Sequence, residues 1–442
     1  MAEDANAKTL LTTSILGTMR VFVVLLAGFL ASKWPKHEPL LTAETRRCAS
    51  RLCTLLFLPA LVISSVGATL TPAALRDSWQ LVVASSFTIL ASNFTAWAFA
   101  RTLLGPEDRI TYQPVQLAIA FQNPAAFPLL LVASLCEQDD IKSDTVGDAA
   151  ECLTKATGMI FIYVVIWQVL FYVWGYNSLT HNDALEVELT GRSCSLSSST
   201  AETAVPESTA ALLEQRQCVV ENTSRQMIAR DGGGSMADGC RGGSAWKACR
   251  LRAWDIVASP NIIAVACGLV IAMVPSVQEM LFGNPQAILR PLGAAIQTIG
   301  TPEVAVSTLV MAGSLAQVPS AGAATRTEIE GEGESVPRNR RRFRLVVGTA
   351  LLGCRLIVVP AVGFSLYWLA RAGSSVTGET RVMHLVVLIE FGMPSASLVI
   401  VVLNQVRMTA TAGFLSRLLV WQYGAAMFTV SAWTALAVRM LY

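Results

Sequence analysis

Charged residues are scarce in this chain. They make up 14% of its 442 residues, hydrophobic residues make up 53%, and the net charge is only +2. The mean hydropathy is +0.51. Because soluble globular domains carry about 25% charged residues, this composition excludes an ordinary soluble domain and offers no basic surface for nucleic acid. It predicts a membrane protein whose surroundings are a lipid bilayer.

Motifs that carry catalysis or metal binding are also missing. The ten cysteines include no CxxC pair, which argues against a zinc site and a thioredoxin-like centre. The sequence contains no nucleophile elbow and no P-loop. We therefore expect no enzymatic activity, no cofactor, no metal site and no ATP-driven pumping. The first residues, MAEDANAKTL, lack the basic start and cleavage site of a signal peptide, so we expect the first apolar run to be a permanent span.

Long apolar runs dominate the chain instead. A helix needs about 20 apolar residues to cross a bilayer. Ten such runs occur, at residues 11–32, 48–68, 75–104, 110–136, 152–176, 254–274, 287–315, 345–370, 382–404 and 411–441. We predict an all-α membrane protein with a first five-helix repeat (1–176), a mostly disordered cytosolic loop rich in serine, glycine and charge (177–250), and a second five-helix repeat (251–442).

Prolines interrupt the fourth and ninth runs in the same way. Residues 120–131 read AFQNPAAFPLLL, and residues 390–400 read EFGMPSASLVI. A phenylalanine stands three residues before Pro124 and before Pro394, and an alanine follows each proline by two residues. Because proline removes a backbone donor and clashes with the preceding turn, we predict breaks at Pro124, Pro128 and Pro394.

A second proline pair supports an internal repeat. Pro59 in the second run and Pro302 in the seventh, where we also predict helix breaks, are each followed, five residues later, by a serine. An odd number of spans in each half makes the second half enter the membrane from the opposite side. We therefore predict a 5+5 inverted repeat in which the proline-broken helices four and nine cross.

The two breaks predict a binding site. Broken backbone survives in a membrane only where it is packed in protein or lines a wet cavity. The N-terminal ends of half-helices also offer N–H groups and a partial positive charge to an anion. We expect the substrate to contact Gln122, Asn123, Pro124, Pro394 and Ser395. The alternative is that the amides only satisfy carbonyls freed by Pro124 and Pro128.

Four charged residues fall near the expected midplane: Arg20, Glu303, Arg355 and Glu390. Each opposes insertion by about 2.5–3.5 kcal/mol when it stands unpaired at a helix centre. Two positive and two negative charges suggest structural ion pairs. The sharper hypothesis is that Glu303 or Glu390 titrates during transport and couples substrate movement to protons.

Basic residues predict the orientation, because cytoplasmic loops are enriched in lysine and arginine. They gather in the loops of one predicted side, at Lys33, Lys36, Arg46, Arg47, Arg51, Arg338 and Arg340 to Arg342. The loop at residues 137–155 is acidic instead. We expect both termini to be non-cytosolic and the long loop to be cytosolic. Cys136 and Cys152 flank the acidic loop, and we favour two unpaired cysteines over a disulfide.

The motifs taken together resemble the auxin efflux carrier family, and within it the PIN-LIKES branch. The matching segments are LFLPALVISSVGATLT (56–71), NPAAFPLLLVASLC (123–136), SPNIIAVACGLVIAMVP (259–275), CRLIVVPAVG (354–363) and the segment around Pro394. The resemblance implies a carrier of small organic anions such as indole-3-acetic acid, with an elevator-like movement. It also implies an endoplasmic reticulum membrane rather than the plasma membrane, and a structural or interfacial role for Arg355. A homodimer is left open.

Two other functions stay open at this stage. A sodium-coupled carrier of the bile-acid type would share ten spans and crossed broken helices, and would need oxygen ligands for the ion near the break. A non-transporting receptor or scaffold would act through the cytosolic loop. Dependence of uptake on a sodium gradient would identify the first, and loss of function on deletion of the loop would identify the second.

Overall fold

The computed structural model describes residues 23–34, 40–103, 109–136, 149–179, 258–316, 336–371, 378–406 and 408–441. The chain divides into two compact units, Met1–Asp183 with Ala258–Tyr442, and Ala184–Val257. All described residues belong to the first unit. Arg20 and most of the predicted cytosolic loop lie outside them.

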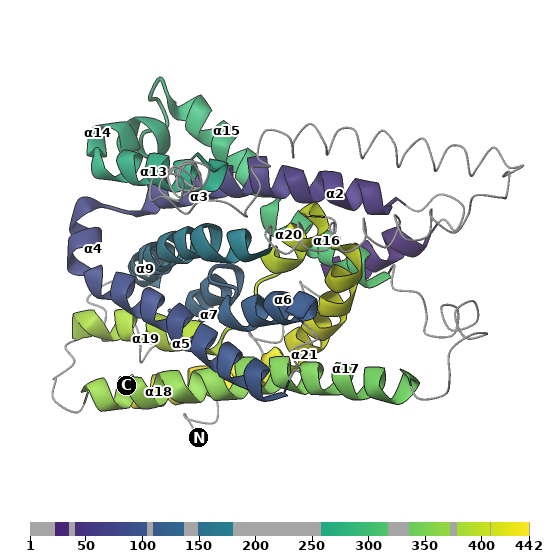
Figure 1. Ribbon diagram of the computed structural model, residues 1–442. Coiled ribbons are helices and arrows are strands. Elements are labelled where there is room, and N and C mark those ends of the chain that lie inside the picture. Colours follow the sequence, from purple (N-terminus) through teal and green to yellow (C-terminus); the bar gives the residue numbers. More distant parts are fainter. Residues whose placement is uncertain are drawn as a thin grey trace, which may run out of the picture. The chain divides into compact units, whose positions relative to one another are not determined.

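The described regular structure is helical (Figure 1). A first helix covers Val23–Lys33. The other helices are α2 (Ala43–Leu52), α3 (Leu58–Thr69), α4 (Pro72–Asp77), α5 (Trp79–Leu103), α6 (Arg109–Ala120), α7 (Ala126–Leu135), α9 (Ala149–Leu170), α13 (Pro260–Met273), α14 (Pro275–Gln278), α15 (Arg290–Gly300), α16 (Glu303–Ala316), α17 (Val336–Gly353), α18 (Val359–Arg371), α19 (Gly378–Gly392), α20 (Leu398–Gln405) and α21 (Thr409–Leu441). Four π-helical turns, Cys53–Phe57, Phe171–Tyr176, Glu279–Gly283 and Cys354–Val358, extend or join them.

Six helices in the described part of the chain are long and apolar enough to cross a membrane, at Ala43–Thr69, Trp79–Phe99, Ala150–Leu179, Arg290–Ala316, Leu345–Leu369 and Thr411–Leu441. They correspond to predicted runs two, three, five, seven, eight and ten. Predicted run six is a bent pair, Pro260–Met273 with Pro275–Gly283, that turns by 104°. Runs four and nine consist of two shorter helices each. The fold is an all-α membrane protein, and the ten-span 5+5 repeat stays a prediction.

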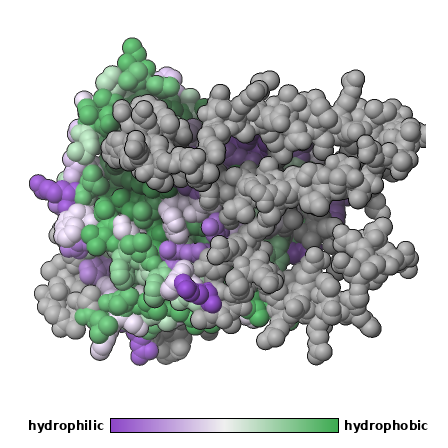
Figure 2. Space-filling model, in the orientation of Figure 1, coloured by the Kyte–Doolittle hydropathy of each residue, from purple (hydrophilic) through white to green (hydrophobic). Residues whose placement is uncertain are grey.

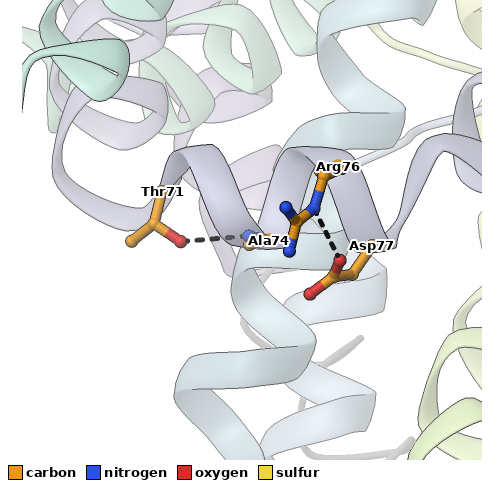
Figure 3. Close-up of polar contacts among 4 residues, drawn as sticks. All are labelled: Thr71, Ala74, Arg76 and Asp77. Atoms are coloured by element: carbon orange, nitrogen blue, oxygen red, sulfur yellow. Dashed lines mark hydrogen bonds and ion pairs between the residues drawn. The ribbon is translucent and has the colours of Figure 1, made fainter.

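Capping residues set where several helices begin. Thr71 precedes Pro72 at the start of α4, and its hydroxyl accepts a hydrogen bond from the Ala74 N–H at 3.1 Å (Figure 3). Ser259 stands before Pro260 in the same way at the start of α13. A proline at the first helical position costs no helical hydrogen bond, because a backbone N–H at this position would have no partner within the helix. The sequence therefore ends α3 and begins α4 at Thr71, and it begins α13 after Ser259.

An ion pair lies at the end of α4, where Arg76 Nε is 3.3 Å from an Asp77 carboxylate oxygen (Figure 3). Both side chains are largely exposed. Exposed pairs of this kind contribute little to stability, so the pair marks a polar connection between α3 and α5 and not a structural anchor.

Close helix packing joins α3 to α13 and α15, which gather at the top of the view in Figure 1. A Cβ atom built on Gly300 would lie 2.6 Å from the Leu61 nitrogen, and one on Gly293 would lie 2.0 Å from the Leu281 oxygen. Only glycine permits these approaches, as is common where membrane helices pack. The sequence therefore fixes the end of α15 directly against α3.

Hydrophobic side chains cover much of the described surface in Figure 2, including the part where α13 and α14 lie in Figure 1. Large apolar side chains that are more than half exposed include Val270, Met273, Leu292, Phe94 and Trp421. A soluble monomer rarely exposes so much apolar area. This surface is the one expected of helices that face lipid.

A disulfide joins Cys136, just after α7, to Cys152 in the first turn of α9. The preference for two unpaired cysteines was wrong. Two cysteines at apolar helix ends carry no local signal of pairing, because only the packing of α7 against α9 brings them within reach. The bond ties the end of α7 to α9.

Candidate functional site

The two proline-containing segments lie against each other, although about 270 residues separate them. The Asn123 N–H donates to the Pro394 carbonyl at 2.7 Å, and the Ala396 N–H donates to the Phe121 carbonyl at 3.0 Å. Gln122 and Ser395 face each other as an isolated antiparallel bridge. Backbone groups that the prolines exclude from helical bonding thus find partners in the other segment, which satisfies a strong requirement of buried backbone.

Aromatic packing holds the first segment in place. The fully buried Phe121 ring contacts Trp167, Phe171 and Trp174 at centroid distances of 5.5, 5.0 and 5.5 Å. These rings belong to α9 and the π-helical turn that follows it. Their edge-to-face and tilted arrangements are the favourable geometries for aromatic pairs, so the start of the break is fixed relative to α9.

Helix α18 makes room for the equivalent phenylalanine of the second segment. A Cβ atom on Gly363 would lie 2.3 Å from two atoms of the Phe391 ring. The ring therefore rests directly on the α18 backbone. Helix α21 adds two polar contacts, because the Tyr423 hydroxyl donates to the Ser395 carbonyl at 2.9 Å and Gln422 Oε1 accepts from the Ser395 N–H at 3.3 Å.

A cavity of about 80 Å³, measured as the space open to the centres of water molecules, lies beside the paired segments. It is lined by α3, α9, α16 and both non-helical segments, through Leu58, Leu61, Val62, Asn123, Pro124, Ala125, Phe161, Val164, Trp167, Gln168, Glu303, Val304, Ser307, Ala396, Ser397 and Leu398. One water needs about 10–15 Å³ by this measure. The cavity therefore admits several waters or a small organic molecule.

The lining contains both apolar and polar residues. Aliphatic side chains of α3 and the rings of Phe161 and Trp167 are among the apolar ones. Asn123, Ser397, Ser307 and Gln168 supply amides and hydroxyls. Among the described lining residues, Glu303 is the one acidic residue, and none is a lysine or arginine. Such a lining suits a ligand with one polar end and one apolar end.

A family model described as membrane transport protein, which represents the auxin efflux carriers, matches residues 14–434. The chain is a member of the auxin efflux carrier family. It is 21% identical over 450 residues to Protein PIN-LIKES 6 of Arabidopsis thaliana, with 97% of this chain and 95% of the relative covered. Protein PIN-LIKES 1 of the same plant is 22% identical over 287 residues, which cover 62% of this chain and 52% of the relative. Membership makes the chain a multi-pass membrane protein.

In this member of the family, the residues predicted to contact substrate separate into two groups. Asn123 and Pro124 line the cavity. Gln122, Pro394 and Ser395 lie in the paired backbone behind it, and the Gln122 amide nitrogen donates to the Tyr163 hydroxyl. The structure thus brings the predicted set together, with two members facing the cavity and three supporting it.

The predicted charged residues also separate. Glu303 begins α16 and lines the cavity, whereas Arg355 and Glu390 are fully buried beside the paired segments. The Arg355 guanidinium contacts the main-chain oxygen of Glu390. Both carboxylate oxygens of Glu390 have no hydrogen-bond partner in the described part of the chain.

The predicted helix breaks differ in effect. Pro124 and Pro394 stand in the non-helical segments, and Pro128 lies in the first turn of α7. Pro302 lies in the turn between α15 and α16. Pro59 is accommodated in the first turn of α3, directly after a π-helical turn, where the helix continues.

Sequence reasoning missed several residues of the site. Gln168 of α9 lines the cavity, and its amide oxygen has no partner among the described residues. Trp167 of the same helix lines it too. Tyr423 and Gln422 of α21 support the second segment. A polar side chain in an apolar run was the available signal, but it does not say which element the side chain faces.

Proposed function

We propose that this member of the auxin efflux carrier family is a secondary-type carrier of small organic anions, with indole-3-acetic acid as the leading candidate. The observation that carries the proposal is a cavity that opens on the starts of two half-helices. Helix α7 begins at Ala126 and α20 begins at Leu398, and the cavity is lined by the residues directly before and at these starts. In transporters, such half-helix N-termini point at anionic groups of the substrate.

The polar groups of the cavity would receive a carboxylate. The first N–H groups of a helix have no helical partner and carry a partial positive charge of about half a unit. Both half-helices present such groups at the cavity, where the Asn123 amide and the Ser397 hydroxyl also lie. No cationic side chain is needed, because backbone N–H groups bind anions by themselves.

The apolar residues of the cavity would receive an aromatic ring. Phe161 and Trp167 of α9 line the cavity together with aliphatic side chains of α3. Burying a ring of this size stabilises a complex by roughly 25 cal/mol for each Å² of apolar surface removed from water. A ligand with one ring system and one carboxylate therefore matches both kinds of lining residue.

Glu303 suggests how movement is coupled. A second negative charge within the cavity would repel a carboxylate in surroundings of low dielectric constant. We propose that Glu303 holds a proton whenever the anion is bound, so that proton and substrate move together. When the cavity is empty and Glu303 is deprotonated, the negative charge of this residue would oppose movement of the site across the membrane.

The wider architecture of the proposal follows the family. We propose ten spans in a 5+5 inverted repeat with crossed broken helices four and nine, an endoplasmic reticulum membrane, non-cytosolic termini and a cytosolic loop at residues 177–250. Relatives named PIN-LIKES support this assignment over nearly the whole chain. The disulfide Cys136–Cys152 fits an oxidising compartment on the side of the acidic loop.

Equilibrium binding of labelled indole-3-acetate to purified protein tests the proposal. Asn123→Ala should weaken binding about tenfold or more, because a hydrogen bond to a charged group contributes roughly 1.5–3 kcal/mol. Asn177→Ala is the matched control, since Asn177 lies outside the cavity lining and should bind as the wild type does. Equal binding by all three proteins would refute the assignment of the cavity.

A further inference from the structure

Arg355 is a fully buried basic residue beside the paired segments. It belongs to the π-helical turn Cys354–Val358 between α17 and α18, and its side chain is fully buried. Such turns inside α-helices are frequent at functional sites. Because a buried charge is costly unless hydrogen bonds compensate it, the partners of the guanidinium define its role.

Main-chain oxygens are its principal partners. Arg355 Nε donates to the Met393 carbonyl at 2.8 Å, Nη2 donates to the Glu390 carbonyl at 3.4 Å, and Nη1 donates to the Ile119 carbonyl at 3.4 Å. Nη1 is also 3.2 Å from the Ser92 hydroxyl of α5. A single side chain thus contacts carbonyls from both non-helical junctions.

The prolines remove the usual helical donors of two of these carbonyls. The Glu390 oxygen would normally accept from the residue four positions on, which is Pro394 and has no N–H, and its remaining backbone donor is the Met393 N–H at 3.3 Å. The Ile119 oxygen would accept from Asn123, whose N–H is used by Pro394 instead. The guanidinium therefore replaces helical donors that the two breaks remove.

The same place is electrostatically suited to a cation. Helices α6 and α19 both end here, at Ala120 and Gly392, and each helix end carries a partial negative charge. In transporters with broken helices, half-helix C-terminal ends and unwound carbonyls coordinate the coupling Na⁺ or proton.

We propose that Arg355 is a tethered cation that takes the place of a coupling metal ion at this junction. Its charge satisfies the oxygens of both helix ends permanently, so the carrier binds no sodium ion there. The consequence for transport rests on the proposed function. That one cation is held between two helix ends can be tested in the protein without substrate.

Removal of the side chain should therefore create a cation requirement. In Arg355→Ala the carbonyls of Ile119, Glu390 and Met393 would surround the truncated side chain together with the Ser92 hydroxyl. Hard cations take oxygen ligands of this kind. We expect sodium, or guanidinium at low concentration, to restore the lost stability.

The experiment measures thermal unfolding of the full chain, purified in detergent without substrate. Wild type and Arg355→Ala are compared in sodium chloride and in N-methylglucamine chloride at equal ionic strength. In a second comparison, guanidinium is added to one sample and the same concentration of urea, its neutral isostere, to another. Wild type should unfold at one temperature in both salts. Arg355→Ala should unfold at a lower temperature that rises selectively with sodium or guanidinium and not with urea.

Two further variants separate this role from simple packing. Arg46 is also buried, and it donates to the Gly313 carbonyl near the end of one helix, α16. Arg46→Ala should lose stability without selective recovery in sodium. Arg355→Lys keeps the charge and should remain insensitive to sodium, as the wild type is.

The outcomes are decisive in either direction. Sodium-dependent stability of the wild type would overturn the proposal, as would equal stability of Arg355→Ala in both salts and with guanidinium. If Arg355→Ala can be extracted into detergent in sodium chloride only, that result supports the proposal. Failure of extraction in both salts overturns the proposal. The proposed substrate can fail its binding test without affecting these measurements.

Discussion

Gly363→Ala should destabilise the protein by displacing Phe391 from its place on α18. The added methyl group would lie 2.3 Å from Cγ and Cδ1 of the Phe391 ring and 2.7 Å from Cδ2. Non-bonded carbons are at their optimum about 3.5–4.0 Å apart. The ring would therefore have to move by roughly 1 Å or more.

The displacement cannot be absorbed by a flexible side-chain end. Cγ is attached directly to the Phe391 Cβ, so relief needs movement of the backbone next to Gly392 and Pro394. Overpacking of this kind costs about 1–3 kcal/mol, against a gain of about 1 kcal/mol from replacing a helical glycine with alanine. We expect a net loss of up to about 2 kcal/mol, with weaker substrate binding because the second segment shifts.

Gly353→Ala provides the matched control. Gly353 ends α17 in the same apolar span, and apart from its chain neighbours and its own helix backbone no atom of the described residues lies within 4 Å of an added Cβ. This variant should unfold at the wild-type temperature or slightly above it. Thermal unfolding and indole-3-acetate binding are measured for both variants. If Gly363→Ala matches Gly353→Ala in both assays, the close packing of Phe391 on α18 is not what positions the second segment.

Three more predictions concern single contacts. If proton and substrate move together, uptake by the wild type should rise at lower pH after the uptake by protein-free liposomes is subtracted. Glu303→Gln should abolish this rise. A retained rise would exclude Glu303 as the coupling group. Tyr423→Phe should lower the free energy of unfolding by about 1–2 kcal/mol because it leaves the buried Ser395 carbonyl unpaired. An unchanged free energy of unfolding in Tyr423→Phe would contradict this reasoning. Cys152→Ser should lower the free energy of unfolding by about 3 kcal/mol, and reduction of the wild-type disulfide should lower it by the same amount. Cys267→Ser, at a free cysteine, should leave it unchanged.

Local sequence signals were enough to place most elements of the fold. Apolar length located the six long spans, and Pro124 and Pro394 marked the two non-helical segments because proline acts on its own backbone. The repeat of phenylalanine before each proline also had a structural cause. Phe121 and Phe391 each anchor one segment, on α9 and on α18 respectively.

Partners that depend on tertiary packing could not be predicted in the same way. Arg355 was visible as a charge in an apolar run, but a carboxylate was its expected partner, and main-chain carbonyls are the partners that the structure shows. The Cys136–Cys152 disulfide depends on packing of α7 against α9. Likewise, only the meeting of α3, α9 and α16 at the paired segments makes Gln168 and Trp167 part of the cavity.

Uptake of labelled indole-3-acetate into proteoliposomes tests the central claim most directly. Wild type should take up the label faster than protein-free liposomes do, Asn177→Ala should match it, and Asn123→Ala should lose most of the protein-dependent uptake. Uptake by Asn123→Ala at the wild-type rate, or wild-type uptake equal to that of protein-free liposomes, would contradict an anion carrier centred on the paired segments.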